Sequence, residues 1–322
     1  THKSSPHFSM RVVEIYDTGN FPKLVLAAKK KFAASYGLDS AFWQHFDAEE
    51  APEVLAYLKG NLEDLANHYH ALYQETERPE DKPGHFTESA HWYRVYLGSF
   101  PAETETPGIH YQLADLLLQN EDFSEAATEY EHIAYDYPEH DRASSAGYAA
   151  IFAHRQFEKR VDESAREAVQ REAVASTLRF VDGFPAHEHA AAVLGAAIDD
   201  LYGLKEYPRA IATAHRLLDE YAESAQAIRR AAWTVIAHAS FDTDDFETAE
   251  RSYSQVLVLT PPEDESAAAI TNNLAAAIYK QGELANAAED YRAAADHFLR
   301  IGTMAPASEI RPIAEYDACL LY

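Results

Sequence analysis

The sequence predicts an all-α protein built as a solenoid of antiparallel helix pairs, and three observations lead to this fold class. Only 12 Gly and 14 Pro interrupt the 322 residues. No segment of ten or more residues shows the apolar–polar alternation of a half-buried strand. Helix-terminating residues recur at intervals of 37, 47, 37 and 39 residues, at Pro101, Pro138, Pro185, Ala222 and Pro261. A near-constant interval of this size is typical of helical repeat arrays.

The clearest repeat unit runs from residue 109 to residue 138. Apolar residues fall at helical spacing over residues 109–119 and again from Phe123 onward, on either side of the short loop 120–122. Pro138 ends the second helix, because proline cannot continue the backbone hydrogen-bond ladder. A loop this short joins two antiparallel helices.

The same layout recurs over residues 190–221, 233–261 and 271–299, where a second helix opens with a large apolar residue and an alanine follows three positions later. One structural position is therefore assigned to Phe123/Ala126, Tyr207/Ala210, Phe246/Ala249 and Leu284/Ala287. Paired helices approach to about 8–10 Å only where contact residues are small. These contacts are expected at Ala114, Ala126, Ala210, Ala237, Ala249, Ala275 and Ala287. Residues 156–170 are expected to lengthen the loop and second helix of one repeat.

Three segments follow from the regularity of the repeats. Residues 1–106 are expected to form degenerate repeats with insertions, with helices near 10–17, 21–36 and 85–100 and a helix or helix pair over 51–74. Residues 107–301 form the regular array, and residues 302–322 begin a further, truncated repeat. Because position 1 is not methionine and residues 313–322 open a helix without a stop signal, we expect a fragment of a longer protein.

Composition argues against several classes of partner. With 53 acidic and 27 basic residues the net charge is −26, and so negative a surface repels phosphate backbones, so no nucleic acid is expected. No stretch approaches the roughly 18 apolar residues of a membrane span, so we expect no direct membrane insertion by this fragment. The single cysteine, Cys319, excludes a disulfide within the chain and is expected to be a buried, inert thiol.

The common motifs of catalysis are absent. GxGxxG, P-loop, GxSxG and HExxH patterns do not occur, which removes the usual phosphate cradles, nucleophile elbow and zinc helix. The histidine pairs considered for a metal ion are His68/His70, His187/His189 and His132/His140. Residues two apart on a helix point to different faces, and the second pair lies in a turn between repeats. We therefore expect no enzyme, no catalytic residue, no metal site and no cofactor.

The units resemble the tetratricopeptide repeat family from about residue 107 to residue 301. The resemblance rests on a small residue in the first helix, an aromatic residue and alanine opening the second, and a final proline; Trp233 and Gly282 fall where the family often carries Trp and a loop Gly. It implies a right-handed superhelix of about seven repeats, counting partial ones at both ends.

Two inter-repeat segments, residues 137–143 and 184–190, also resemble a subgroup of bacterial envelope proteins. This subgroup includes the outer-membrane assembly lipoprotein BamD and the TolA-binding coordinators. The resemblance implies the periplasm or cell envelope of a Gram-negative bacterium, with the cytoplasm as the alternative.

In the tetratricopeptide repeat family the first helix of each pair lines a concave groove that binds partners. The resemblance implies a partner-binding set at Tyr111, Asp115, Leu118, Tyr148, Phe152, Asp199, Tyr202, His238, Phe241, Asn272 and Tyr279. One inward column would contain Leu118, Tyr202, Phe241, Tyr279 and Tyr322. Aromatic side chains are enriched in binding hot spots, although packing between neighbouring first helices explains the same residues equally well.

The expected function is therefore a non-catalytic scaffold or adaptor. Its partner would be another protein or a peptide, neutral to basic and bearing apolar anchors. Two alternatives remain open: an intracellular module that regulates another domain, and a glycan-binding module that uses exposed aromatic side chains.

Overall fold

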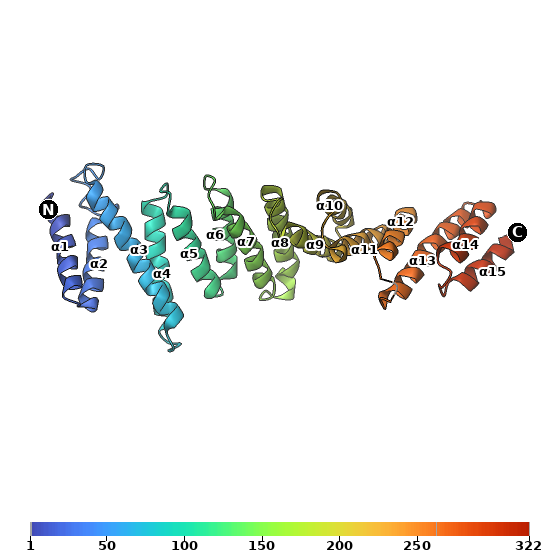
Figure 1. Cartoon of the computed structure of the whole chain (residues 1–322), viewed down its shortest axis with the longest axis horizontal. Coiled ribbons are helices and arrows are strands. Elements are labelled where there is room, and N and C mark those ends of the chain that lie inside the picture. Colours follow the sequence, from blue (N-terminus) through green and yellow to red (C-terminus); the bar gives the residue numbers. More distant parts are fainter. Residues whose placement is uncertain (1, 262, 322) are drawn as a thin grey trace. The chain divides into compact units, whose positions relative to one another are not determined.

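A computed structural model describes residues 2–261 and 263–321, and within them the chain is helical throughout. These residues form fifteen α-helices and no strand (Figure 1), which confirms the predicted fold class of stacked helix pairs. The chain divides into two compact units, Thr1–Arg160 and Val161–Tyr322. The handedness of the superhelix and the partition at residues 106 and 301 stay predictions.

Unit 1 contains the first seven helices, and helices consecutive in sequence pack on one another. They are α1 (Ser5–Thr18), α2 (Pro22–Tyr36), α3 (Pro52–Glu75), α4 (Lys82–Ser99), α5 (Thr106–Gln119), α6 (Phe123–Tyr135) and α7 (Ala143–Glu158). The segment between α2 and α3 is held by aromatic packing, because the ring of Phe42 meets those of Tyr36, Trp43 and Phe46 at centroid distances of 4.7–5.1 Å.

Unit 2 contains the remaining eight helices. They are α8 (Glu163–Gly183), α9 (Ala190–Gly203), α10 (Tyr207–Glu220), α11 (Gln226–Asp242), α12 (Phe246–Val258), α13 (Ser266–Ala287), α14 (Tyr291–Met304) and α15 (Arg311–Leu321). Here α9 packs on α10 and also on α11, so first helices of successive pairs lie side by side. The predicted lengthening near residues 156–170 is present, because α8 has 21 residues where α10 has 14.

The loop inside five of the helix pairs has one recurring geometry. A non-glycine residue adopts a positive φ of 57–65° at Asn20, Glu121, Lys205, Asp244 and Glu289. The next residue's backbone N–H then bonds to the carbonyl five positions earlier, as from Asp245 to Ser240 (2.9 Å). This bond is the 6→1 contact of a Schellman motif, which satisfies a carbonyl at the end of the first helix. In four of these pairs the second helix begins with a large aromatic residue, at Phe123, Tyr207, Phe246 and Tyr291, and in the first pair Phe21 is the N-cap of α2.

The predicted register of the repeat near residue 284 is wrong. Helix α13 continues to Ala287 and α14 begins at Tyr291, so Leu284 is 56% exposed and the buried alanine of the second helix is Ala294. Leu284 and Tyr291 are seven residues apart, about two helical turns, so periodicity alone places both on one face. The last loop residue distinguishes the two registers, because an acidic residue precedes Tyr291, just as one precedes Phe123, Tyr207 and Phe246.

Gly282 is likewise not a loop glycine. It lies inside α13, where a Cβ atom would come within 2.5 Å of the Phe298 ring on α14. The missing side chain therefore allows the last helix pair of unit 2 to approach closely.

The small residues predicted at helix contacts are buried, with one exception. Ala114, Ala126, Ala210, Ala237, Ala249 and Ala275 are fully buried, which confirms their assignment, whereas Ala287 is exposed because of the shifted register. The expectation for Cys319 was also wrong, because its thiol is exposed on α15. The preceding residue on α15, Ala318, faces the core and is buried, whereas Cys319 is turned away from it.

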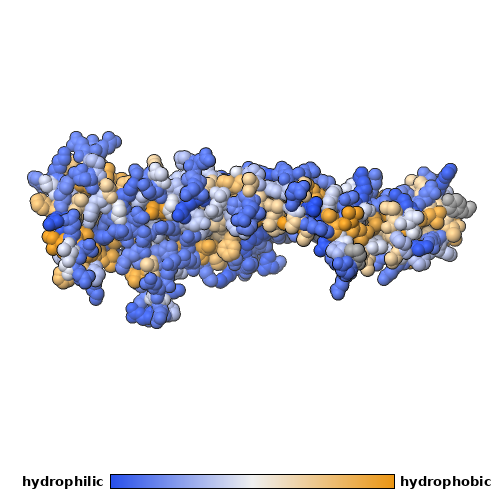
Figure 2. Space-filling model, in the orientation of Figure 1, coloured by the Kyte–Doolittle hydropathy of each residue, from blue (hydrophilic) through white to orange (hydrophobic). Residues whose placement is uncertain are grey.

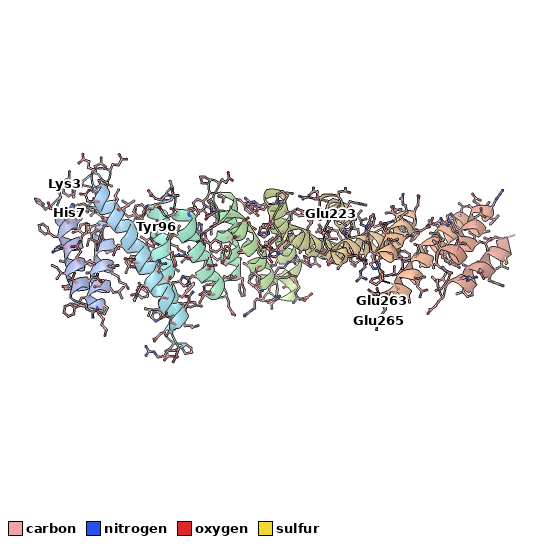
Figure 3. All side chains as sticks on the ribbon, viewed as in Figure 1. Lys3, His7, Tyr96, Glu223, Glu263 and Glu265 are labelled. Atoms are coloured by element: carbon pink, nitrogen blue, oxygen red, sulfur yellow. The ribbon has the colours of Figure 1, made fainter. Side chains whose placement is uncertain are left out.

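The surface of the chain is mostly hydrophilic, with apolar residues gathered over α1 and α2 (Figure 2), where Phe8, Ile15 and Phe21 are exposed. Ion pairs also form there: Lys3, labelled beside the start of α1 in Figure 3, bonds to Glu50 across 3.0 Å. No helix in the described part of the chain combines the length and apolar character needed to cross a membrane.

Candidate functional site

Five of the predicted partner-binding residues lie in unit 1. Tyr111, Asp115 and Leu118 are on α5, whereas Tyr148 and Phe152 are on α7. The two α7 side chains are one helical turn apart, and they are 37% and 50% exposed. Because residues four apart share a helix face, this face of α7 presents aromatic surface to solvent.

Tyr111 and Asp115 are also held by contacts within unit 1. The Tyr130 hydroxyl on α6 donates a hydrogen bond to the Asp115 carboxylate. The Tyr111 ring meets the Tyr130 ring edge-on at 5.3 Å, and the Arg142 guanidinium lies 5.4 Å from the Tyr111 centroid. Burial raises the pKa of Asp115 above its ordinary range, because desolvation outweighs the bond from Tyr130. These two residues therefore fasten α5 to its neighbours as well as facing solvent in part.

In unit 2 the predicted tyrosines bond to the next repeat. The Tyr202 hydroxyl on α9 donates to Asp242 Oδ2 on α11 (2.9 Å), and the Tyr279 hydroxyl on α13 donates to Asp317 Oδ2 on α15 (2.6 Å). Desolvation and the bond to Asp242 raise the pKa of Tyr202 to about 12, and the bond to Asp317 with desolvation raises the pKa of Tyr279 to about 12. Tyr202 and Tyr279 therefore stabilise the stacking of first helices, which was the alternative interpretation of these residues.

Of the other predicted residues of unit 2, three make contacts within the unit and one is exposed to solvent. Asn272 Oδ1 accepts bonds from the Ser308 hydroxyl (2.9 Å) and the Glu309 N–H (3.0 Å), and it thereby holds the loop before α15. His238 Nδ1 lies 2.7 Å from the Tyr253 hydroxyl, and burial lowers the pKa of this imidazole. Phe241 packs edge-on against Phe246, and Asp199 is exposed on α9. The predicted column member Tyr322 lies outside the described residues.

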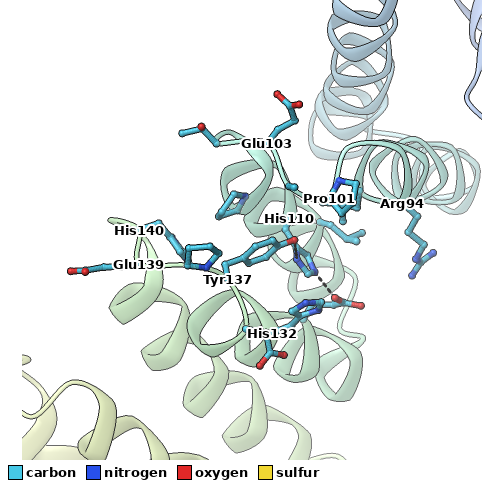
Figure 4. Close-up of a pocket in the computed structure, with 16 residues that line it drawn as sticks. Arg94, Pro101, Glu103, His110, His132, Tyr137, Glu139 and His140 are labelled. Carbon is cyan, nitrogen blue, oxygen red and sulfur yellow. Dashed lines mark hydrogen bonds and ion pairs between the residues drawn. The ribbon is translucent and has the colours of Figure 1, made fainter. Parts of the chain in front are cut away.

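A cavity of about 820 Å³ opens in unit 1 among α4, α5, α6 and the two inter-repeat loops beside them (Figure 4). Its walls include four carboxylates and three imidazoles against a single guanidinium, that of Arg94. Arg94 is itself paired with Glu125 across 2.5 Å. The surrounding sequence, residues 101–150, holds eleven acidic residues and one basic residue. The cavity therefore favours cationic ligands.

Three titratable side chains of this cavity converge on one point. His110 on α5 is 3% exposed, and its Nε2 donates to Glu129 Oε2 on α6 across 2.5 Å. This bond lowers the pKa of Glu129. The His132 ring stands nearly perpendicular to the His110 ring at a centroid distance of 5.0 Å. One ligand atom from each of His110, Glu129 and His132 lies within 4.8 Å of the others.

Tyr137 contacts both imidazoles of this cluster. Its hydroxyl lies 3.1 Å from His110 Nδ1, and its ring stacks on His132 at 5.4 Å with an interplanar angle of 11° (Figure 4). Desolvation raises the pKa of the phenol. Tyr137 thus fixes the orientation of both rings.

Histidines that are close in sequence do not form this cluster. His140 lines the same cavity, but its Nε2 bonds to the Ile133 carbonyl (2.8 Å), and His70 is buried against the Tyr93 hydroxyl (3.0 Å). His110 is 22 residues from His132 and becomes its neighbour only through the packing of α5 on α6. The one local signal for the cluster was the spacing of Glu129 and His132, which places both on one face of α6.

The tryptophans do not provide an exposed platform for sugars. Trp92 is buried, and its indole N–H donates to Glu88 (3.0 Å). Trp43 is half-buried and donates to the Tyr36 carbonyl (2.9 Å), and Trp233 is half-buried beside His215. None of the three favours the glycan-binding alternative.

Comparisons with known proteins give matches to solved structures. No protein-family model and no curated protein matches the sequence. A tetratricopeptide repeat protein from Parabacteroides merdae is 12% identical, with 80% of this chain and 98% of that chain covered and a TM-score of 0.37. PilF from Pseudomonas aeruginosa is 13% identical over 80% of this chain and 99% of its own, with a TM-score of 0.32.

A third match is a signal transduction ATPase with a tetratricopeptide repeat sensor from Pyrococcus horikoshii. It is 15% identical, covers 100% of this chain and 52% of its own, and has a TM-score of 0.33. None of these matches assigns a partner or a site to this chain.

Proposed function

We propose that this chain is a non-catalytic scaffold that binds another protein through the first-helix face of unit 1, formed by Tyr111, Asp115 and Leu118 on α5 with Tyr148 and Phe152 on α7. The observation that carries the proposal is the exposure of Tyr148 and Phe152 one turn apart on α7. Aromatic surface of this kind gives large contact area at low entropic cost, which is typical of interface anchors.

The chemistry of the partner follows from the charge around this face. Residues 101–158, which include α5, α6 and α7, carry twelve acidic side chains and two basic side chains, so the surface attracts Lys and Arg and repels acidic segments. The occupant we propose is a segment of another protein with an aromatic or aliphatic anchor flanked by basic residues. The anchor would pack on Phe152 and Tyr148.

An array of synthetic peptides tests this proposal. Basic content and apolar content are varied independently, and dissociation constants are measured by fluorescence anisotropy for the parent chain and a Tyr148→Ala/Phe152→Ala variant. Peptides with both features should bind, and the double variant should weaken them at least about tenfold, the loss expected for hot-spot anchors.

The matched control is Val258→Ala, since Val258 is 76% exposed on α12, remote in sequence from the proposed face. It should leave the affinity within about twofold. The proposal would be contradicted if the control and the double variant lost affinity equally, or if affinity did not depend on the basic and apolar content of the peptides.

The proposed setting is a complex in the envelope of a Gram-negative bacterium, supported by the resemblance of residues 137–143 and 184–190 to envelope repeat proteins. Fractionation of the source cells followed by immunodetection tests it. Recovery with periplasmic or envelope markers is expected, whereas recovery with cytosolic markers would favour the intracellular regulatory module.

A further inference from the structure

We propose that His110, Glu129 and His132 bind a divalent transition-metal ion, for which zinc is the best match. Two imidazoles and one carboxylate are the ligand types that suit Zn²⁺, and hard cations such as Mg²⁺ prefer all-oxygen sites. Within the described residues these three side chains are the one group of His, Cys, Asp or Glu whose ligand atoms meet. This inference does not depend on the proposed protein-binding face.

The geometry needs only side-chain adjustment to hold the ion. With bonds of roughly 2.0–2.2 Å, ligand atoms around tetrahedral zinc lie roughly 3.3–3.6 Å apart. Here His110 Nε2 and Glu129 Oε2 are 2.5 Å apart, and all three ligand atoms fall within 4.8 Å. The ion would move His110 Nε2 and Glu129 Oε2 apart by about 1 Å and would draw the His132 side chain toward them. His132 is at the exposed rim, where its side chain can shift inward while its ring stays stacked on Tyr137.

The backbone already holds the ligands on rigid elements. Glu129 and His132 are three residues apart on α6, so both project from one face of that helix toward α5. The same Glu-x-x-His spacing supplies metal ligands from helices in other bundle proteins. His110 enters from α5, which packs on α6.

Tyr137 supplies the outer-sphere contact that a ligating histidine usually has. Such a histidine donates its second ring N–H to an oxygen acceptor, which fixes the tautomer and directs the other nitrogen at the metal. The Tyr137 hydroxyl is 3.1 Å from His110 Nδ1 and is placed to accept that bond. Metal binding would use the other neutral tautomer of His110: the Nε2 proton leaves to solvent, Nδ1 takes up a proton from solvent, and the Nδ1–H donates to the Tyr137 oxygen.

The cavity leaves a fourth coordination position open. The ion would sit at the wall of the space of about 820 Å³, which further carboxylates from Glu103, Asp136 and Glu139 also line. Their charge raises the local concentration of cations. Three protein ligands and one open position allow water, or a side chain from a partner, to complete the tetrahedron.

Titration of the purified chain with zinc chloride tests the site. Isothermal calorimetry of the metal-free protein should show one strong site, and Co²⁺ in its place should give the visible absorption bands of tetrahedral coordination. His132→Ala removes an exposed ligand and Glu129→Gln removes a charge, and each should weaken binding at least about thirtyfold. Tyr137→Phe should weaken binding about tenfold, the range found for outer-sphere partners.

Two controls separate this site from adventitious binding to the chain's 16 histidines. His140→Ala lies in the same cavity outside the ligand set and should leave affinity within about twofold. Acidification should release the ion, because protonated imidazoles do not ligate. Circular dichroism verifies that every variant remains helical. Absence of stoichiometric zinc uptake, or uptake that His132→Ala and Glu129→Gln leave unchanged, would overturn the proposal.

Discussion

Replacing Gly282 with alanine should destabilise unit 2, although the same change stabilises most helices. Alanine is favoured over glycine in a helix interior by about 1 kcal/mol. At Gly282 the new Cβ would lie 2.5, 2.7 and 2.9 Å from three ring carbons of Phe298, a side chain that is itself buried. Overpacking of this kind costs about 1–3 kcal/mol. The net effect of Gly282→Ala is therefore a loss of about 1 kcal/mol.

Gly195→Ala is the matched control in the same unit. Gly195 lies inside α9, where a Cβ would make ordinary contact with Ile228 at 3.7 Å and Leu217 at 3.9 Å. This variant should therefore gain about 1 kcal/mol from helix propensity alone. The two substitutions share their chemistry and differ in the neighbour that the new methyl group meets.

Hydrogen exchange read by mass spectrometry resolves both effects, because repeat arrays open locally and not only as a whole. Amides in α13 and α14 should exchange about fivefold faster in Gly282→Ala, which corresponds to about 1 kcal/mol, and amides in α9 and α10 about fivefold slower in Gly195→Ala. If Gly282→Ala stabilises α13 as much as Gly195→Ala stabilises α9, then Gly282 is not a packing glycine and the register of the last pair is wrong.

Three further predictions concern links between and within repeats. Arg230→Ala should return the pKa of Asp264 from about 2 toward its ordinary value near 4, as read by NMR titration. In the parent chain the ion pair of Asp264 with Arg230 stabilises the folded state fully above about pH 4, and this contribution is lost as the pH falls through about 2. Tyr279→Phe removes the bond to Asp317 and should speed exchange in α15 about fivefold, roughly 1 kcal/mol. Asp244→Gly suits the positive φ of 61° and should leave urea stability unchanged or higher, whereas Asp244→Val should lower it by more than about 1 kcal/mol; similar stabilities for these two variants would contradict the loop geometry.

Helix pairing was predictable from the sequence because it depends on local signals. A large apolar residue and an alanine three positions later open α6, α10 and α12 where expected. The same reasoning failed at Leu284, because a shift of seven residues preserves the apolar face. Only the acidic loop residue before Tyr291 distinguishes the two registers.

The candidate sites depend on longer-range geometry and were predicted less completely. The bonds from Tyr202 to Asp242 and from Tyr279 to Asp317 join residues 40 and 38 positions apart, so the sequence could not separate stacking from partner contact. The cluster of His110, Glu129 and His132 forms across two helices whose relative rotation is set by packing. Sequence proximity pairs His132 with His140, but His140 Nε2 bonds to the Ile133 carbonyl, and no metal site was expected from the sequence.

Photocrosslinking tests the proposed binding face most directly. The chain is made with p-benzoylphenylalanine in place of Phe152, or in place of Val258 as the control, and each form is irradiated with a basic, apolar peptide selected from the array. Crosslinks from position 152 and none above background from position 258 are expected, because only the first-helix face of unit 1 is proposed to hold the peptide. Crosslinking from position 258 alone, or equally from both positions, would place binding elsewhere and contradict the proposed function.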